Sequence, residues 1–258
     1  MPDMHAARAH MVDVQIARRG VSDARVLDAM REVPREAFVP EGMEEFAYED
    51  GPMPIGEGQT ISQPYIVGLM IEAAELRPGA RVLEIGAGSG YAAAVLSRIA
   101  DSVHAIERHG KLTGMAEARL SRLGYDNVTL RTGDGTRGWA GAGPFDAIIV
   151  AAGTPGAPES LKRQLVIGGR LVIPVQHGAQ HQTLTRIRRT AEDAWEDEEL
   201  GAVRFVPLIG AEGWTEDGQR AASNHVPRGG RGISDQLIGS GLLMKDRRED
   251  GETEALYS

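Results

Sequence analysis

The strongest constraint on the fold is an alternation of short apolar runs with helix-like segments between residues 77 and 175. Apolar runs bounded by turn residues predict buried strands, and the segments between them have the pattern of helices. The predicted strands are 81–85, 102–106, 127–130, 145–150 and 169–175, and the predicted helices include 91–99 and 111–123. This order predicts an α/β fold whose sheet is mainly parallel and is covered by helices on both faces.

The segments on either side extend this core. Before it we expect helices at 6–19, 22–30 and 64–74, with Ser22 as an N-cap, and a loop rich in proline and glycine at 34–63. After it, residues 183–189 and 203–208 are strand-like, and the acidic run 192–199 indicates a solvated face or a hairpin loop. The predicted divisions are a helical cap with an active-site loop at 1–63, a core at 64–210 and a weakly ordered extension at 211–258.

Composition narrows the classes of function. The formal charge is −9 and no long basic run is present, which argues against a nucleic-acid partner. The absence of cysteine excludes disulfides, thiolate metal sites and cysteine nucleophiles, and it suits a reducing compartment. Neither a membrane-spanning apolar stretch nor a secretory signal is visible, so we expect a cytoplasmic protein with no membrane contact.

Three glycines follow the first predicted strand in the segment VLEIGAGSGY: Gly86, Gly88 and Gly90. A strand-to-helix turn that lets a cofactor lie against the main chain has no room for Cβ atoms, and the N-terminus of the helix offers free N–H groups. The dinucleotide pattern G-x-G-x-x-G would need a glycine where this chain has Tyr91. The pattern is instead E-x-G-x-G-x-G.

Acidic residues close three successive strands: Glu84, Glu107 and Asp134. Glu84 would repel a pyrophosphate but attract an ammonium or sulfonium group, and Glu107 is placed to accept hydrogen bonds from both hydroxyls of a ribose. Asp134, within the sequence GDG, could bond an adenine amino group. A glycine loop alone can be only a tight turn, but three carboxylates at these positions favour a positively charged nucleoside ligand.

Four segments, VLEIGAGSGY, HAIER, GDG and PFDAIIV, resemble the successive motifs of class I S-adenosylmethionine-dependent methyltransferases. PIGEGQTISQP, VPREAFVP and AVRFVPL further resemble the protein-L-isoaspartate (D-aspartate) O-methyltransferase family, and the similarity runs from residue 11 to residue 209. The resemblance implies a Rossmann-like fold with an N-terminal helical cap and a seven-stranded sheet whose last strands are connected differently from the usual methyltransferase order. It also implies S-adenosyl-L-methionine as cofactor.

The implied activity is methyl transfer to the α-carboxylate of L-isoaspartyl and D-aspartyl residues in damaged proteins, which starts their repair through a succinimide. Isoaspartyl proteins and peptides would be the partners, and the sequence does not indicate an oligomeric state. Two alternatives stay open. One is a methyltransferase for a small-molecule carboxylate or hydroxyl, and the other is a catalytically silent S-adenosylmethionine-binding module.

Ser62 matches the residue regarded as the active-site serine of this family. Because a carboxylate is already anionic at neutral pH, we expect Ser62 to donate a hydrogen bond that orients one carboxylate oxygen rather than to act as a base or nucleophile. The expected cofactor-binding residues are Gln59, Thr60, Glu84, Gly86, Gly88, Gly90, Glu107, Asp134 and Gly135. The expected substrate-binding residues are Pro54, Ile55, Gly56, Ile61, Val206 and Pro207.

Competing interpretations of individual residues are simpler. Ser62 could be an N-cap of the helix that begins near Pro64, whereas a Ser-His-Asp hydrolase is disfavoured because Ser62 is not in a G-x-S-x-G turn. His177 and His181 lie at a turn between two predicted strands. We therefore expect solvated histidines there and not a metal site. Trp139 is expected to serve packing rather than cofactor stacking.

Overall fold

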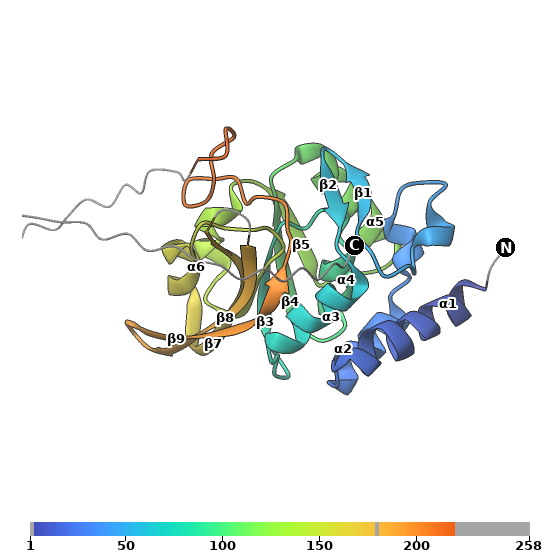
Figure 1. Ribbon diagram of the computed structural model, residues 1–258, viewed down its shortest axis with the longest axis horizontal. Helices are drawn as coiled ribbons and strands as arrows, with labels where there is room; N and C mark the ends of the chain where they lie inside the picture. Colours follow the sequence, from blue (N-terminus) through green and yellow to red (C-terminus); the bar gives the residue numbers. More distant parts are fainter. Residues whose placement is uncertain (1–2, 179–180, 220–258) are drawn as a thin grey trace, which may run out of the picture. The chain divides into compact units, whose positions relative to one another are not determined.

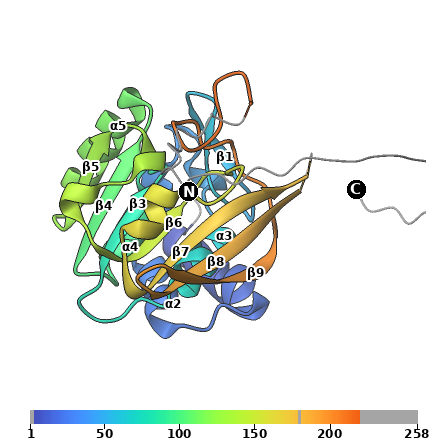
Figure 2. The same cartoon turned by 90° about the vertical axis from the view of Figure 1, so that its left-hand side faces the viewer.

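A computed structural model describes residues 3–178 and 181–219, and within them seven strands form one central sheet. The strand order is β5-β4-β3-β6-β7-β8-β9 (Figures 1 and 2). Pairing is parallel from β5 to β7 and antiparallel from β7 to β9. The predicted mainly parallel, seven-stranded sheet is therefore confirmed, and its last three strands follow one another along one edge. The strands are β3 (Arg81–Ile85), β4 (Ser102–Glu107), β5 (Val128–Thr132), β6 (Phe145–Val150), β7 (Leu165–His177), β8 (His181–Ala191) and β9 (Ala194–Val203).

The two faces of the sheet are covered by different helices. Successive side chains of a strand point to opposite faces, so Val82 joins one buried cluster and Leu83 joins another. The cluster of Val82 includes residues of α2 (Ala24–Glu32), α3, α4 and α5, whereas that of Leu83 includes Leu161 of α6. The prediction of helices on both faces is confirmed. The helices are α3 (Pro64–Ala73), α4 (Tyr91–Ser97), α5 (Gly110–Arg122) and α6 (Glu159–Arg163).

The N-terminal residues form a helical layer beside α3 and α4, as Figure 1 shows for α2. The first predicted helix is less regular than expected, because α1 (Met4–His10) continues as a π-helical turn (Met11–Ile16) and a 3-10 turn (Ala17–Arg19) before it ends at Gly20. The next helix, α2 (Ala24–Glu32), has Asp23 and not Ser22 as its N-cap. The Asp23 carboxylate accepts the Arg25 N–H, whereas the main-chain N–H of Ser22 donates to Glu72.

The segment predicted as one long loop, 34–63, has structure of its own. It contains two 3-10 turns (Arg35–Phe38 and Glu44–Phe46) and a separate hairpin of β1 (Met53–Gly56) and β2 (Gln59–Ile61). Glu57 and Gly58 connect the two strands, both with positive φ (51° and 68°), as a two-residue hairpin loop of the primed type requires. The hairpin carries the QTI residues to the carboxyl ends of the central strands.

The chain after β9 also differs from the prediction. The predicted strand 203–208 is wrong in its position, because β9 ends at Val203 and the following residues make only an isolated bridge, Gly153↔Pro207. Residues 208–219 then pack on the core: Ala211 N–H donates to Asp134 and the Trp214 indole donates to the Gly153 carbonyl (3.0 Å). The rest of the predicted extension, residues 220–258, lies outside the described residues. Within 3–178 and 181–219, no helix is long and apolar enough to span a bilayer.

Candidate active site

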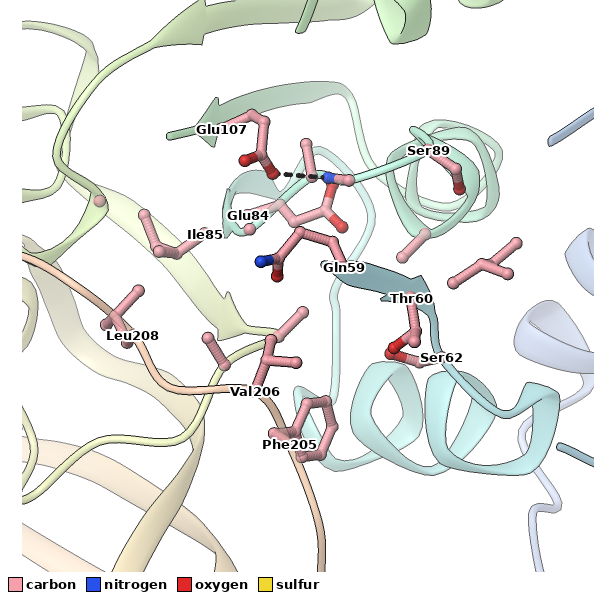
Figure 3. Close-up of a pocket in the computed structure, with 18 of the residues that line it drawn as sticks. Gln59, Thr60, Ser62, Glu84, Ile85, Ser89, Glu107, Phe205, Val206 and Leu208 are labelled. Carbon is pink, nitrogen blue, oxygen red and sulfur yellow. Dashed lines mark hydrogen bonds between the residues drawn. The ribbon is translucent and has the colours of Figure 1, made fainter. Parts of the chain in front are cut away.

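A cavity of about 750 Å³ lies at the carboxyl ends of the parallel strands. Its walls come from three parts of the chain that are far apart in sequence: residues 59–63, the turns that follow β3, β4, β5 and β6, and residues 202–209. In Figure 3 Glu84 and Glu107 lie on one side of the Gln59 side chain, and Phe205 and Val206 lie on the other. This edge of a parallel sheet is where α/β proteins bind nucleotides, because the strand ends and helix N-termini converge there.

The predicted glycine loop forms the turn between β3 and α4. Gly86, Gly88 and Gly90 all have positive φ, at 86°, 52° and 86°, which L side chains rarely adopt. Gly86 and Gly88 line the cavity, whereas Gly90 is the N-cap of α4 and faces Leu120 beneath the turn. The main chain of the first two glycines is therefore open to a ligand, and the third allows close packing of the helix.

Glu107 fixes this loop from the neighbouring strand. Its carboxylate accepts the Gly88 N–H (2.8 Å, dashed in Figure 3) through one oxygen and the His109 N–H (2.9 Å) through the other. The side chain is buried, yet it lines the cavity. Because each carboxylate oxygen can accept more than one hydrogen bond, two acceptors are held rigidly at the spacing that a pair of vicinal hydroxyls can use.

Glu84 is the least satisfied charged group of the site. It is 1% exposed, lines the cavity, and its Oε2 has no hydrogen-bond partner among the described residues. Burial and the nearby Glu107 carboxylate raise the pKa of Glu84 to about 8. A buried carboxylate without a partner is costly unless a ligand supplies one, so this end of the cavity suits a cationic group.

Asp134 has partners other than those expected. One carboxylate oxygen accepts the N–H (2.9 Å) and hydroxyl (2.7 Å) of Thr136, and the other accepts the Ala211 N–H (2.9 Å). Asp134 is not among the residues that line the cavity, although its neighbours Gly133 and Gly135 are. The predicted bond to an adenine amino group stays a prediction, and in this structure Asp134 ties the 208–219 segment to the turn after β5.

Ser62 lies at the end of the hairpin segment and lines the cavity with Gln59, Thr60 and Ile61. The N-cap of α3 is Gln63, without a side-chain capping bond, and the Ser62 hydroxyl makes no hydrogen bond within the described residues. The simple capping interpretation is therefore wrong. Its hydroxyl keeps its full capacity to donate to a ligand.

Arg35, to which no sequence pattern gave a role, lies directly behind Ser62. Its guanidinium is fully buried and donates to the Ala47 carbonyl (2.7 Å) and the Ser62 carbonyl (2.9 Å). No carboxylate pairs with it among the described residues, and burial lowers its pKa. The VPREAFVP motif pointed to this region of the chain but gave no role to the arginine.

The remaining predicted substrate residues divide into two groups. Val206 and Pro207 line the cavity, and the Val206 carbonyl accepts the Gly153 N–H (2.7 Å). Pro54, Ile55 and Gly56 do not line it. Ile55 is buried against Gly88, where an added Cβ atom would lie 3.1 Å from Ile55 Cδ1, so β1 supports the glycine loop from behind.

Two further cavity residues, Arg108 and His109, were not singled out from the sequence. They follow Glu107 directly, and Arg108 forms an ion pair with Glu216 of the 208–219 segment. Trp139 lies away from the cavity and packs edge-on against His104, as expected for a packing role. Within residues 3–178 and 181–219, no group of three or more histidine and acidic side chains is placed to hold a metal ion.

The parallel sheet, the E-x-G-x-G-x-G turn and the two buried acids define a Rossmann-like fold of the class I methyltransferase type. A family model described as protein-L-isoaspartate(D-aspartate) O-methyltransferase (PCMT) matches residues 6–213. The chain belongs to this family.

Individual relatives agree with the family match. The chain is 61% identical to protein-L-isoaspartate O-methyltransferase 1 of Rhodopseudomonas palustris (strain HaA2), over 81% of this chain and 85% of the relative. It is 59% identical to protein-L-isoaspartate O-methyltransferase 2 of Pelobacter propionicus, over 80% of this chain and 92% of the relative.

Two solved structures are similar to most of the chain. One, a protein-L-isoaspartate O-methyltransferase, has a TM-score of 0.71 and 32% identity, and the match covers 79% of this chain and 66% of that longer chain. The other is described as a protein-L-isoaspartate O-methyltransferase from Plasmodium falciparum in complex with S-adenosyl-L-homocysteine. It has a TM-score of 0.68 and 26% identity, over 78% of this chain and 98% of that chain.

Proposed function

We propose that this protein methylates the α-carboxylate of L-isoaspartyl and D-aspartyl residues in damaged proteins, with S-adenosyl-L-methionine as methyl donor. The observation that carries the proposal is the shape of one cavity, which joins two buried acids on one side to the Ser62 hydroxyl and the 204–208 segment on the other. Family membership supplies the substrate class. The absence of cysteine suits a reducing compartment, and we place the enzyme in the cytoplasm.

The residues of the cavity fit S-adenosyl-L-methionine. Glu84 offers an unpaired buried oxygen to the ammonium group of the methionine part, and Glu107 offers its two fixed oxygens to the ribose hydroxyls. The main chain at Gly86 and Gly88 is open to the cavity, which leaves room for the ligand to lie between Glu84 and Glu107. When bound, the cofactor supplies a methyl group on a sulfonium centre.

The chain's own contribution to the reaction is orientation. The substrate carboxylate is anionic at neutral pH, so one of its oxygens needs no general base to accept the methyl group that a bound S-adenosyl-L-methionine would supply. Ser62 donates a hydrogen bond that aims this oxygen. The cavity walls exclude water, which would otherwise solvate the carboxylate and slow the attack.

Replacing Ser62 tests this role. We expect Ser62→Ala to lower methyl transfer to an isoaspartyl peptide by at least about tenfold, because one oriented donor is lost. The Kd for S-adenosylhomocysteine should stay within about twofold, since the hydroxyl is not assigned to the cofactor. Ser121→Ala, an exposed serine on α5, is the matched control. An unchanged turnover in Ser62→Ala would remove the assigned role.

The substrate is tested separately with wild-type protein. Tritium-labelled methyl transfer is measured for an isoaspartyl peptide, for the same peptide with a normal aspartate, and for small carboxylic acids. We expect transfer to the isoaspartyl peptide alone. Transfer only to small acids would replace the proposal with a small-molecule methyltransferase, and cofactor binding without transfer to any of them would indicate a silent binding module.

A further inference from the structure

The wall of the cavity formed by residues 204–208 is not held by a sheet. β9 pairs with β8 as far as the partners Gln182 and Val203, and beyond them the ladder stops. The next residues nevertheless continue to line the cavity, as far as Ile209. Something other than strand pairing must therefore fix this segment.

The Gln182 side chain takes over from the strand ladder. Its Oε1 accepts the Phe205 N–H (2.6 Å), and its Nε2 donates to the Phe205 carbonyl (3.1 Å). One carboxamide thus makes both hydrogen bonds that a paired strand residue would make with Phe205. A serine or a lysine at this position could not do so, because the arrangement needs a donor and an acceptor side by side.

Gly153 makes room for this contact. A Cβ atom built on Gly153 would overlap the Gln182 carboxamide. Gly153 also bonds the same segment from its other side, since its N–H donates to the Val206 carbonyl (2.7 Å) and its carbonyl accepts the Leu208 N–H (2.8 Å). The two residues together hold the segment at Phe205, Val206 and Leu208.

These bonds determine which main-chain groups remain for a ligand. Both groups of Phe205 and the Val206 carbonyl are occupied, and Pro207 has no N–H. The Val206 N–H has no hydrogen-bond partner among the described residues, and it belongs to a cavity-lining residue. A peptide that adds to this edge can therefore pair in few registers.

We propose that Gln182 is a positioning residue that sets the geometry and register of the substrate-binding edge at residues 204–207. The inference rests on the proposed function, because it assigns this edge to the main chain of the isoaspartyl peptide. Gln182 itself does not line the cavity, so it acts through Phe205 and Val206 and not by contact with the methyl donor.

The test compares Gln182→Ala and Gln182→Glu with Gln176→Ala in the full-length protein. Glutamate can accept the Phe205 N–H but repels the Phe205 carbonyl, so it separates the two bonds without loss of volume. Gln176 is the cross-strand partner of Gln182 on β7, and its side chain bonds the Gly178 carbonyl, so its loss leaves the edge intact. Steady-state kinetics are measured with isoaspartyl peptides of increasing length, together with the Kd for S-adenosylhomocysteine.

We expect both Gln182 variants to raise KM for the longest peptide by about tenfold, with a smaller rise for the shortest, because main-chain pairing beyond the isoaspartyl residue is what the edge supplies. kcat and the Kd for S-adenosylhomocysteine should stay within about twofold of the wild type. Hydrogen exchange of the Phe205 amide should accelerate in Gln182→Ala and not in Gln176→Ala.

Three outcomes would overturn the inference. They are an unchanged KM, a KM rise that does not depend on peptide length, and an equal loss of cofactor affinity, which would indicate a general structural role. A wild-type protein that does not methylate isoaspartyl peptides would instead remove the proposed function. In that case the exchange rate of the Phe205 amide would still report whether Gln182 holds the edge.

Discussion

At the scale of single residues, the site combines groups that have too few partners for their burial. Among the residues that the structure describes, one buried oxygen of Glu84 has no partner, and no carboxylate lies beside the fully buried Arg35 cation. Burial of such groups lowers the stability of the fold, so they are expected mainly where they serve binding or catalysis. Both lie within or directly behind the cavity walls, where a ligand can recover the cost.

Glu84 makes the stability of the ligand-free protein depend on pH. Its folded pKa of about 8 lies above the ordinary value of 4.5, so the folded state binds this proton more tightly than the unfolded state does. The free energy of unfolding should therefore fall as pH rises from about 4.5 to about 8, because ionisation is then less favourable in the folded state. We expect Glu84→Gln to raise the Tm at pH 8 but not near pH 5. Equal Tm changes at both pH values would contradict this.

Cofactor affinity should also depend on the ionisation of Glu84, but it should rise with pH, whereas the free energy of unfolding falls. A ligand ammonium binds ionised Glu84, so the affinity for S-adenosylhomocysteine should rise about tenfold per pH unit between about pH 6 and pH 8 and then level off. In Glu84→Gln this slope should disappear. Isothermal titration calorimetry in two buffers of different ionisation enthalpy measures the proton released on binding. A wild-type affinity without this slope would exclude the ammonium contact.

Arg35 should affect the chemical step and not cofactor binding. Its bond to the Ser62 carbonyl fixes the main chain that carries the orienting hydroxyl. We expect Arg35→Met to lower kcat for an isoaspartyl peptide by at least about tenfold, because small displacements of an orienting group are costly. The Kd for S-adenosylhomocysteine should change less than about threefold. Arg31→Met, a surface arginine of the same helical layer, is the control, and a similar kcat loss there would contradict the assignment.

The sequence could predict some of these residues and not others. Glu84 and Glu107 could be predicted because each lies at the end of a strand, and adjacent parallel strands place their carboxyl ends together, here beside the glycine turn. Asp134 occupies an equivalent sequence position, but its carboxylate is engaged by Thr136 and Ala211. Arg35 and Gln182 act on residues 27 and 23 positions away, and no local pattern encodes such contacts.

At the scale of elements, β9 shows how an exposed sheet edge is kept from pairing. It is the last strand of the sheet and carries four consecutive exposed acids, Glu196 to Glu199. Charges on an edge strand disfavour the addition of another strand. Arg186 pairs with Glu198, so part of the acidic face is also tied to β8.

Removing these charges should promote association. We expect the double variant Asp197→Val and Glu199→Val to self-associate more than the wild type at about 100 μM, since an apolar edge strand is a template for pairing. Multi-angle light scattering after size exclusion measures the change. Glu117→Val, an exposed acid on α5, should leave the mass distribution unchanged. An unchanged distribution in the double variant would show that charge does not protect this edge.

The strands and helices of the core were predictable because apolar runs and helical periodicity are local signals. The 145–150 strand agrees residue for residue. The β1–β2 hairpin was missed because its turn uses Glu57 with positive φ, where asparagine or aspartate before glycine is the usual signal. The acidic 192–199 run has the predicted solvated face, but its strand character depends on pairing with β8.

At the scale of the whole molecule, residues 208–219 belong to the folded core in the structure. Trp214 donates its indole N–H to Gly153 and its main-chain N–H to Leu208, and Glu212 accepts hydrogen bonds from Ser160. Part of the chain that composition assigned to a weakly ordered extension therefore packs on the core beside the cavity, where Glu216 pairs with the cavity residue Arg108. Gly153 and Ser160 lie more than 50 residues away from their partners in this segment, so composition alone could not reveal these contacts.

Trp214→Ala tests this contribution. The variant loses one hydrogen bond and the packing of a half-buried indole, which costs about 2 kcal/mol. For a domain of this size we expect the Tm to fall by about 4–8 °C in differential scanning calorimetry. Asp217→Ala, an exposed residue of the same segment, should change the Tm by less than about 1 °C. Equal Tm values for Trp214→Ala and wild type would show that the segment adds nothing to the fold.

Residues 59–63 and 202–209 form walls of the cavity, and the two acids lie on the far side of Gln59 from Phe205 and Val206. A damaged side chain can reach that depth only if the client protein yields an extended stretch of main chain. Isoaspartyl sites within a rigid helix would wait for local unfolding, so their methylation rate would be limited by how often the helix opens. The enzyme would then repair proteins in order of their local flexibility, and methylation rates for one lesion placed in hosts of graded stability would measure that order.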